Sequence, residues 1–378
     1  MENYKKLIGS ITIITFSYAA SRVLGFFREI LLANWAGVSE ATDTLDLAFI
    51  IPDFLFYLSA GGYLAITLIP LMSGKEGEEL NNYFLSILYG LSIIFVLFSL
   101  LTYSFRFQFA ELLDVKSLDF FTEVFTPIIF SQVFFFIGAI LMSYQYFNDN
   151  FKYAALAPVV YNSTIILFGW LNSSTPEDTV KGFALGTLLG SVLGHFLIQI
   201  YGAKKSGLNF YFISPKYKHL KEYITISLPL ILGQSIAVID EQLFRVFGSF
   251  LSAGSIATFR YARRIALLPV GIIAQAVGVA SYPLLSRLFQ NNEIDELVKL
   301  VKKQLSYLFL IGSSLMVISI INSEYLIEII YERGAFTNKD TIRVSAVFTI
   351  ISLAIIPWSI NQILTRSYYV QQRFWFPV

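Results

Sequence analysis

The chain has 378 residues, of which 56% are hydrophobic and 14% are charged, with a formal net charge of +1. Soluble domains carry about 25% charged residues, so the composition indicates a polytopic membrane protein. The near-neutral charge gives no electrostatic basis for binding nucleic acid. The chain has no cysteine and only two histidines, which excludes disulfides, thiol chemistry and histidine-rich metal sites. We expect no metal and no other cofactor.

Ten segments have the length and apolar character of membrane helices. The first follows Lys5 and Lys6 as a signal peptide would, but it has no small-residue cleavage motif, so we interpret it as a retained helix. Crossing the hydrocarbon core takes about 20 apolar residues, and such runs are far too long for barrel strands. The sequence therefore predicts an all-α polytopic membrane protein. Three segments carry internal charges, at roughly 6–34, 43–73 and 221–252, and seven are uncharged: 80–105, 124–148, 153–176, 182–203, 265–286, 304–323 and 344–365.

Lysines and arginines concentrate in one alternating set of flanks and loops. This set includes Lys5, Lys6 and the Lys-rich connection at about 203–221. Because cytoplasmic loops carry the excess of positive charge, we expect both termini to lie on the cytoplasmic side of the membrane. The connection at 203–221 is rich in aromatic residues as well, and we expect it to lie on the membrane surface and join two bundles.

Two distant segments resemble each other, as expected for a transporter built from repeated halves. Segment 41–73 begins Ala-Thr and ends Ile-Pro-Leu-Met-Ser, and segment 257–286 begins Ala-Thr and ends Tyr-Pro-Leu-Leu-Ser. Their prolines, Pro70 and Pro283, lie 213 positions apart. This repeat predicts an N-terminal lobe over 1–213, with six helices and the inner linker, and a partial C-terminal lobe over 214–378, with four. A second half of equal length would end about 48 residues further on, so the second lobe is expected to be incomplete.

The first helix carries two arginines and a glutamate within an otherwise apolar stretch. Arg22, Gly25 and Glu29 fall on one side of a helix with 3.6 residues per turn. A charge at membrane depth costs at least a few kcal/mol, and usually faces protein or a water-filled cavity. Arginine stays charged and donates in a bidentate fork, which suits a phosphate. We therefore predict that Arg22, Arg28 and Glu29 line a cationic site for an anion; alternatively, Arg28 extends to the membrane interface.

Further polar residues lie at membrane depth in later helices. Arg264, shortly before Pro269, is a third candidate for the anion site. Asp53, beside Pro52, is expected to face the cavity, and Asn162 either lines the cavity or bridges helices. Asp240 and Glu241 are candidates for a coupling-ion or proton site; alternatively, Glu241 pairs with Arg245 one turn later.

Several motifs together resemble one family. The segments 21–29, 41–43, 48–52, 261–265, 268–271 and 332–337 are similar to those of the MurJ/MviN lipid II flippases of the MOP exporter superfamily. The resemblance implies a two-lobed helical transporter that moves an undecaprenyl-diphosphate-linked saccharide by alternating access. It also implies that Arg22, Arg28 and Arg264 take the positions of the family's cavity arginines, and Glu29 that of its adjacent acid.

The chain departs from the resemblance at five places. Tyr57 stands where the family has an arginine, Gly61 and Gly62 where it has a Glu-Gly pair, Ile50 where it has a lysine, Phe244 where many members have a sodium-associated aspartate, and Arg263 where the family has an acidic or amide residue. These departures leave one alternative to lipid II transport, a flippase for another lipid-linked glycan, such as an O-antigen or capsule unit. The expected incompleteness of the second lobe leaves another, a non-transporting membrane remnant. No nucleophile motif or paired-carboxylate pattern supports an enzyme. We expect a monomer, driven by sodium, protons or the membrane potential.

Overall fold

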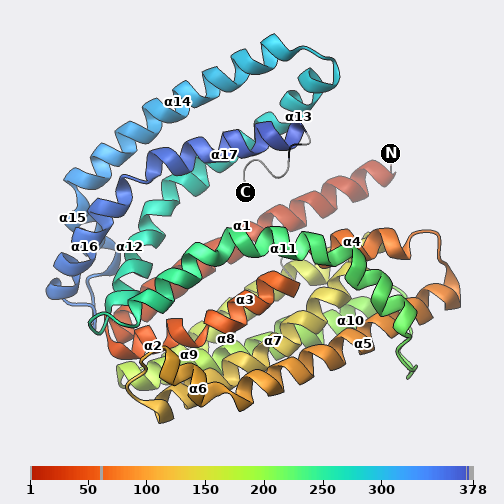
Figure 1. The fold of residues 1–378 in the computed structure, drawn as a ribbon, viewed down its shortest axis with the longest axis horizontal. Coiled ribbons are helices and arrows are strands. Elements are labelled where there is room, and N and C mark those ends of the chain that lie inside the picture. The colour runs from red at the N-terminus through yellow and green to blue at the C-terminus, as the bar shows by residue number, and fades with distance from the viewer. Residues whose placement is uncertain (1, 60–62, 372, 374–378) are drawn as a thin grey trace. The chain divides into compact units, whose positions relative to one another are not determined.

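The computed structural model describes residues 2–59, 63–371 and 373, and every regular element in these ranges is a helix (Figure 1). The predicted all-α membrane fold is confirmed. The chain divides into two compact units, one ending at Gly254 and the other running from Ser255 to Val378. The lobes expected from the repeat, 1–213 and 214–378, are a different division and stay a prediction.

The first unit is a bundle built from the first seven predicted spans. Its helices are α1 (Glu2–Ala36), α2 (Glu40–Ala48), α3 (Ile50–Ser59), α4 (Tyr63–Met72), α5 (Gly77–Ser104), α6 (Arg106–Leu112), α7 (Leu118–Phe147), α8 (Lys152–Leu171), α9 (Pro176–Gly190), α10 (Ile198–Lys205) and α11 (Tyr217–Gly248). The segment Ser191–Leu197 between α9 and α10 is wound as a π-helix.

The second unit contains the remaining three predicted spans. Its helices are α12 (Ser255–Pro269), α13 (Gln275–Gln290), α14 (Ile294–Ile321), α15 (Ser323–Tyr331), α16 (Asn338–Ser352) and α17 (Ile355–Val370). A π-helical segment, Val270–Ala274, follows Pro269 and joins α12 to α13.

The seven uncharged runs all fold as helices long and apolar enough to cross a membrane. Six are continuous stretches, and the seventh is the pair α16 and α17, bent by 44°. The three runs with internal charges are helical as well, as α1, as α2 to α4, and as α11. The total of ten spans stays a prediction, because the described helices that meet both criteria number six, or seven with the bent pair.

Proline explains why the second span is broken near its start. Pro52 has no N–H to donate to the carbonyl of Ala48, four residues earlier, and α2 ends at Ala48. The start of α2 is fixed separately, because the side chain of Ser39 accepts from the backbone N–H of Thr42 in a capping box. A segment that the sequence presents as one span therefore begins as two short helices, α2 and α3.

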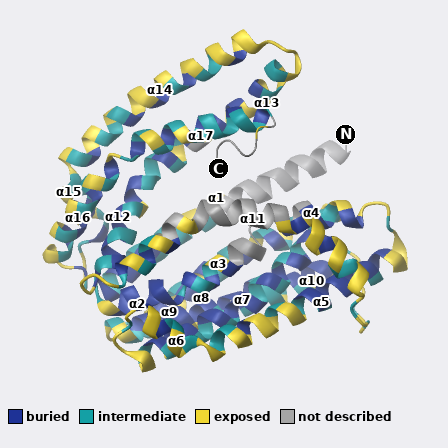
Figure 2. Cartoon of the chain, viewed as in Figure 1, coloured by how far each residue is buried: buried dark blue, intermediate teal, exposed yellow. Residues whose placement is uncertain are grey.

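The core of the first unit forms around α7. This helix contacts α2, α3, α4, α5, α9 and α10, and Figure 2 shows it largely buried. By contrast, α5 and α14 expose rows of large apolar side chains, including Ile93 and Leu97 on α5 and Leu310 and Ile321 on α14. Large exposed apolar patches mark interaction surfaces, and for membrane-spanning helices the partner is lipid.

The connection between α10 and α11 is fastened to α5 by paired hydrogen bonds. Asn81 donates through Nδ2 to the Asn209 carbonyl at 2.8 Å and accepts from the Asn209 N–H at 2.9 Å. Ser86 accepts the N–H of Lys216 at 2.8 Å. The polar residues on α5 thus satisfy backbone groups that an extended linker would otherwise leave unpaired.

The motif at 332–337 has a structural explanation in the second unit. Gly334 has a φ of 59°, Thr337 caps α16, and Glu332 accepts from the Thr341 hydroxyl at 2.5 Å. Phe336 is buried against Tyr261, with ring centroids 5.7 Å apart. The motif therefore ties the turn before α16 to α12.

Candidate functional site

The charged face predicted for the first helix is present on α1. The segment from Arg22 to Glu29 is continuous α-helix, so these two residues, seven positions apart, lie on one face. Arg22 is exposed, whereas Glu29 is only 4% exposed. A Cβ atom built on Gly25 would meet nothing within 4 Å. There is therefore space beside Gly25 on this face, and the role of the face in binding an anion stays a prediction.

Arg28 reaches across from α1 to α8. Its guanidinium donates to Asn162 Oδ1 at 3.2 Å and to Glu29 Oε1 at 3.1 Å. The Asn162 amide is oriented by its own Nδ2, which donates to the Pro158 carbonyl at 2.9 Å, and this leaves Oδ1 for the arginine. Arg28 therefore faces protein, and Asn162 bridges two helices.

A second ion pair links α3 to α11. Arg245 donates to Asp53 Oδ2 at 2.7 Å, and the two side chains are 11% and 31% exposed. The sequence offers Glu241 as one possible partner of Arg245; in the structure Arg245 bonds to Asp53, 192 positions away. The side chains of Asp240 and Glu241 lie outside the described residues, so their role as a coupling-ion site stays a prediction.

Tyr161 on α8 lies near both pairs, close to Arg28 and to Asp53. Its ring meets the ring of Phe135 edge to face at 4.8 Å. Residue patterns in the sequence do not single out this tyrosine, because an aromatic residue in an apolar span usually belongs to the core. The structure thus groups Arg28, Glu29, Asn162, Tyr161, Asp53 and Arg245 in the first unit; we call this set the charged cluster.

The charged cluster holds both signs of charge among the helices of the first unit. Its two arginines face two carboxylates, while Arg22 adds a further positive charge on the same helix as Arg28. Because charges interact strongly where water is scarce, an anion entering beside Arg22 and Arg28 would meet a positive potential. Arg28 retains 24% exposure, so its guanidinium is not sealed from a ligand.

Arg264 belongs to the second unit, on α12, and its side chain is exposed. That it joins Arg22 and Arg28 around one anion stays a prediction. Its neighbour Tyr261 is fully buried and packs against Tyr331, with ring centroids 5.0 Å apart, which anchors this turn of α12.

Comparison with known proteins decides the family. The family model described as "Lipid II flippase MurJ" matches residues 32–378. The chain belongs to the MurJ family. Because the match covers most of the chain and runs through both units, the resemblance seen in the motifs is confirmed, and with it the assignment to a family of transporters rather than enzymes.

Individual MurJ proteins match over most of this chain. Lipid II flippase MurJ of Thermosipho africanus is 31% identical over 374 residues, which is 94% of this chain and 73% of that protein. The probable lipid II flippase MurJ of Buchnera aphidicola subsp. Baizongia pistaciae is 28% identical over 388 residues, covering 97% and 73%. A solved structure of lipid II flippase MurJ in an inward closed conformation superposes with a TM-score of 0.81 at 27% identity, covering 97% of this chain and 77% of that one.

Proposed function

We propose that this chain is a flippase for lipid II, the undecaprenyl-diphosphate-linked precursor of peptidoglycan. Membership of the MurJ family over residues 32–378 carries the proposal. The inward closed conformation of a related flippase supports alternating access, in which the cargo site opens first to one side of the membrane and then to the other. The partners of the protein are then the lipid-linked saccharide that it carries and the lipids of the surrounding membrane.

In this proposal the arginines of α1 bind the diphosphate. Arg22 and Arg28 supply the charge, and Arg264 is a third proposed substrate-binding residue. Glu29 and Asn162 hold the Arg28 guanidinium in place, so less side-chain freedom is lost when the anion binds. Asn162 is neutral, so a phosphate oxygen competes with an amide oxygen for one arm of the guanidinium and gains the charge-assisted bond.

The proposal also covers the placement of the chain in the membrane and the source of energy for transport. We place the chain in the bacterial inner membrane with both termini cytoplasmic, acting as a monomer and without nucleic acid. Asp240 and Glu241 are the proposed sites for a sodium ion or a proton, and the membrane potential is the other source of drive. Moving one charge across 100 mV is worth about 2.3 kcal/mol, which is enough to bias two conformations.

Native mass spectrometry of the full chain with lipid II tests the proposal. The wild type should carry one lipid of the mass of lipid II, and the double variant Arg22→Ala/Arg28→Ala should lose it while keeping its melting temperature. Arg106→Ala is a matched control, because Arg106 bonds locally to the Tyr103 carbonyl and lies outside the charged cluster. A folded wild type that binds no polyprenyl-diphosphate lipid would overturn the assignment.

A flippase for another lipid-linked glycan is the second candidate. Ile50 is buried on α3 where the resemblance expects a lysine, so this chain has fewer cavity cations than its relatives. Competition between lipid II and an O-antigen or capsule precursor separates the two. Preferential retention of the competitor would favour the second candidate.

A further inference from the structure

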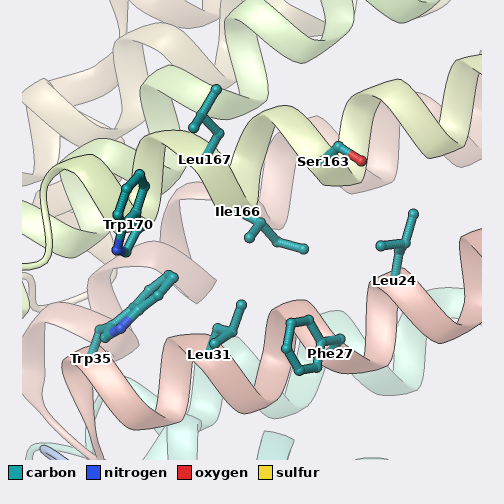
Figure 3. A pocket seen from close by; sticks show the side chains of 8 residues that line it. All are labelled: Leu24, Phe27, Leu31, Trp35, Ser163, Ile166, Leu167 and Trp170. Atoms are coloured by element: carbon teal, nitrogen blue, oxygen red, sulfur yellow. The ribbon is translucent and has the colours of Figure 1, made fainter.

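An apolar groove runs along the seam between α1 and α8, and none of the charged-cluster side chains is part of its lining. Its volume is about 420 Å³. Figure 3 shows Leu24 and Ser163 near one end, Trp35 and Trp170 at the other, and Phe27 among the side chains between them. Apart from the indole N–H groups of the two tryptophans, the hydroxyl of Ser163 is the only polar side-chain group in the lining. Phe27 and Trp170 are 50% and 60% exposed, so the groove is open along its length.

The length of the groove corresponds to one leaflet of a membrane. Leu24 and Trp35 are eleven positions apart on α1, which is about 16 Å at 1.5 Å per residue. The hydrocarbon core of a bilayer is about 30 Å thick, so the groove covers about half of it. A chain lying in the groove would therefore run from one surface of the membrane to its middle.

The two tryptophans mark the end that lies at the membrane surface. Trp35 is the residue before the end of α1 at Ala36, and Trp170 is the residue before the end of α8 at Leu171. Tryptophan is enriched at the interface between membrane and water, and its indole N–H needs a hydrogen-bond partner. At this depth a lipid headgroup or its ester carbonyl supplies that partner.

We propose that this groove holds one acyl chain of a phospholipid from the leaflet on the side where α1 and α8 end. The lining has no charged side chain, and α1 and α8 contact each other, so the space between them suits a single hydrocarbon chain rather than a helix of about 10 Å diameter. The site is separate from the proposed cargo site and does not depend on which cargo is carried.

The position of the groove lets the bound acyl chain affect the charged cluster. Phe27 precedes Arg28, and Ser163 follows Asn162, so the groove flanks the hydrogen bond between α1 and α8. An apolar gap left empty loses dispersion contacts on its lining. The acyl chain restores these contacts and stabilises the arrangement of the two helices that positions the Arg28 guanidinium.

Photo-crosslinking tests the site. The full chain is reconstituted in phosphatidylethanolamine and phosphatidylglycerol vesicles that contain a small fraction of phosphatidylglycerol with a diazirine at the end of one acyl chain. After irradiation, labelled peptides are mapped by mass spectrometry. We expect label at the inner end of the groove, near Leu24 and Ser163, and we expect unlabelled phospholipid to compete for it.

Two serine variants provide the matched comparison. Ser163→Phe fills the inner end and should reduce groove labelling about tenfold, the change that 1.4 kcal/mol produces. Ser314→Phe introduces the same side chain at an exposed position of α14 and should leave the labelling unchanged. If Ser163→Phe does not fold, Leu167→Ala, which removes an exposed wall of the groove, should reduce labelling as well.

Two results would overturn the proposal. One is labelling of the exposed apolar residues of α5 as strong as that of the groove, because this is ordinary contact with bulk lipid. The other is displacement of the label by an undecaprenyl-diphosphate lipid at concentrations where phospholipid has no effect, because the occupant is then the tail of the cargo. Neither result bears on the mass-spectrometric test of cargo binding.

Discussion

At the scale of single residues, Arg28 joins the function to the fold. Its guanidinium donates hydrogen bonds to one neutral and one acidic partner. These bonds fix its orientation and leave other N–H donors available. An arginine has five N–H donors in a planar fork, so donors remain for a phosphate. A lysine at the same position would keep the charge but not this geometry.

Replacing Arg28 separates charge from geometry. Hydrogen bonds to charged groups contribute about 1.5–3 kcal/mol, so Arg28→Ala should weaken lipid II binding about 10- to 100-fold. Arg28→Lys should give an intermediate loss, measured by titrating lipid II against the purified chain. Equal affinity of Arg28→Lys and the wild type would mean that only the charge matters and that the bonds to Asn162 and Glu29 play no part in binding.

His219 provides a test of pH dependence away from the charged cluster. Its ring packs on Tyr83 with ring centroids 4.6 Å apart. His219 lies in the first turn of α11, just before the predicted span at 221–252. Burial of the ring lowers the pKa of His219 from its ordinary value of 6.5, and the positive charge of the nearby lysines lowers it further. The folded state therefore binds fewer protons than the unfolded state as the pH falls below about 6.5. The charged groups around the ring are Lys75, Lys216, Lys218 and Glu222.

The stability from His219 should thus be complete above pH 6.5 and decline as the pH falls below it. The melting temperature of the wild type should drop more between pH 7 and pH 5 than that of His219→Phe, which keeps an aromatic ring on Tyr83. Parallel pH profiles for the two proteins would show that protonation of this ring has no effect on stability.

At the scale of helices, α11 is held to the first unit at its C-terminal end. Arg245 pairs with Asp53, and beyond the helix the N–H of Gly254 donates to Asp43 Oδ2 at 2.6 Å. Both acceptors come from the second predicted span, and Gly254 has a φ of 81° that favours glycine. The end of the first unit is thus fixed by two carboxylates, Asp53 on α3 and Asp43 on α2.

Exchanging the charges of the α3–α11 pair tests its contribution. Because Arg245 is more buried than Asp53, Asp53→Ala leaves the more buried charge unpaired and should destabilise the protein more than Arg245→Ala. The expected loss of unfolding free energy for Asp53→Ala is about 2 kcal/mol, after allowance for the partly exposed carboxylate. The double variant Asp53→Arg/Arg245→Asp should recover part of this loss. The coupling energy from this set, measured by chemical unfolding in detergent, should be favourable, and a value of zero would show that the two charges act independently.

Much of the helical organisation was predictable because hydrophobic length is a local signal. All seven uncharged runs fold as apolar helices, and Pro52 accounts for the end of α2. The ion pair of Asp53 with Arg245 was not predictable, since a local pattern offers Glu241 one turn away and gives no sign of a partner 192 positions distant. Tyr161 was missed for a related reason: its role depends on two charges contributed by other helices.

At the scale of the whole molecule, the two compact units are what alternating access requires. The boundary follows Gly254, directly after the contact with Asp43. If the units move as bodies, distances within each unit stay constant while distances between them change when cargo binds. The chain has no cysteine, so spin labels attach only where cysteines are introduced.

Double electron–electron resonance on full chains with two introduced cysteines tests this motion. Phe212 is 88% exposed in the first unit, and Gln290 is exposed at the end of α13 in the second, so the pair Phe212→Cys/Gln290→Cys reports on movement between units. Adding lipid II should shift its distance distribution, because a ligand redistributes conformations that it binds with different affinity. The pair Phe212→Cys/Lys152→Cys, both exposed in the first unit, is the control and should not shift. A shift in both pairs would mean that the first unit itself deforms, and motion of the two units as rigid bodies would then be the wrong description of transport.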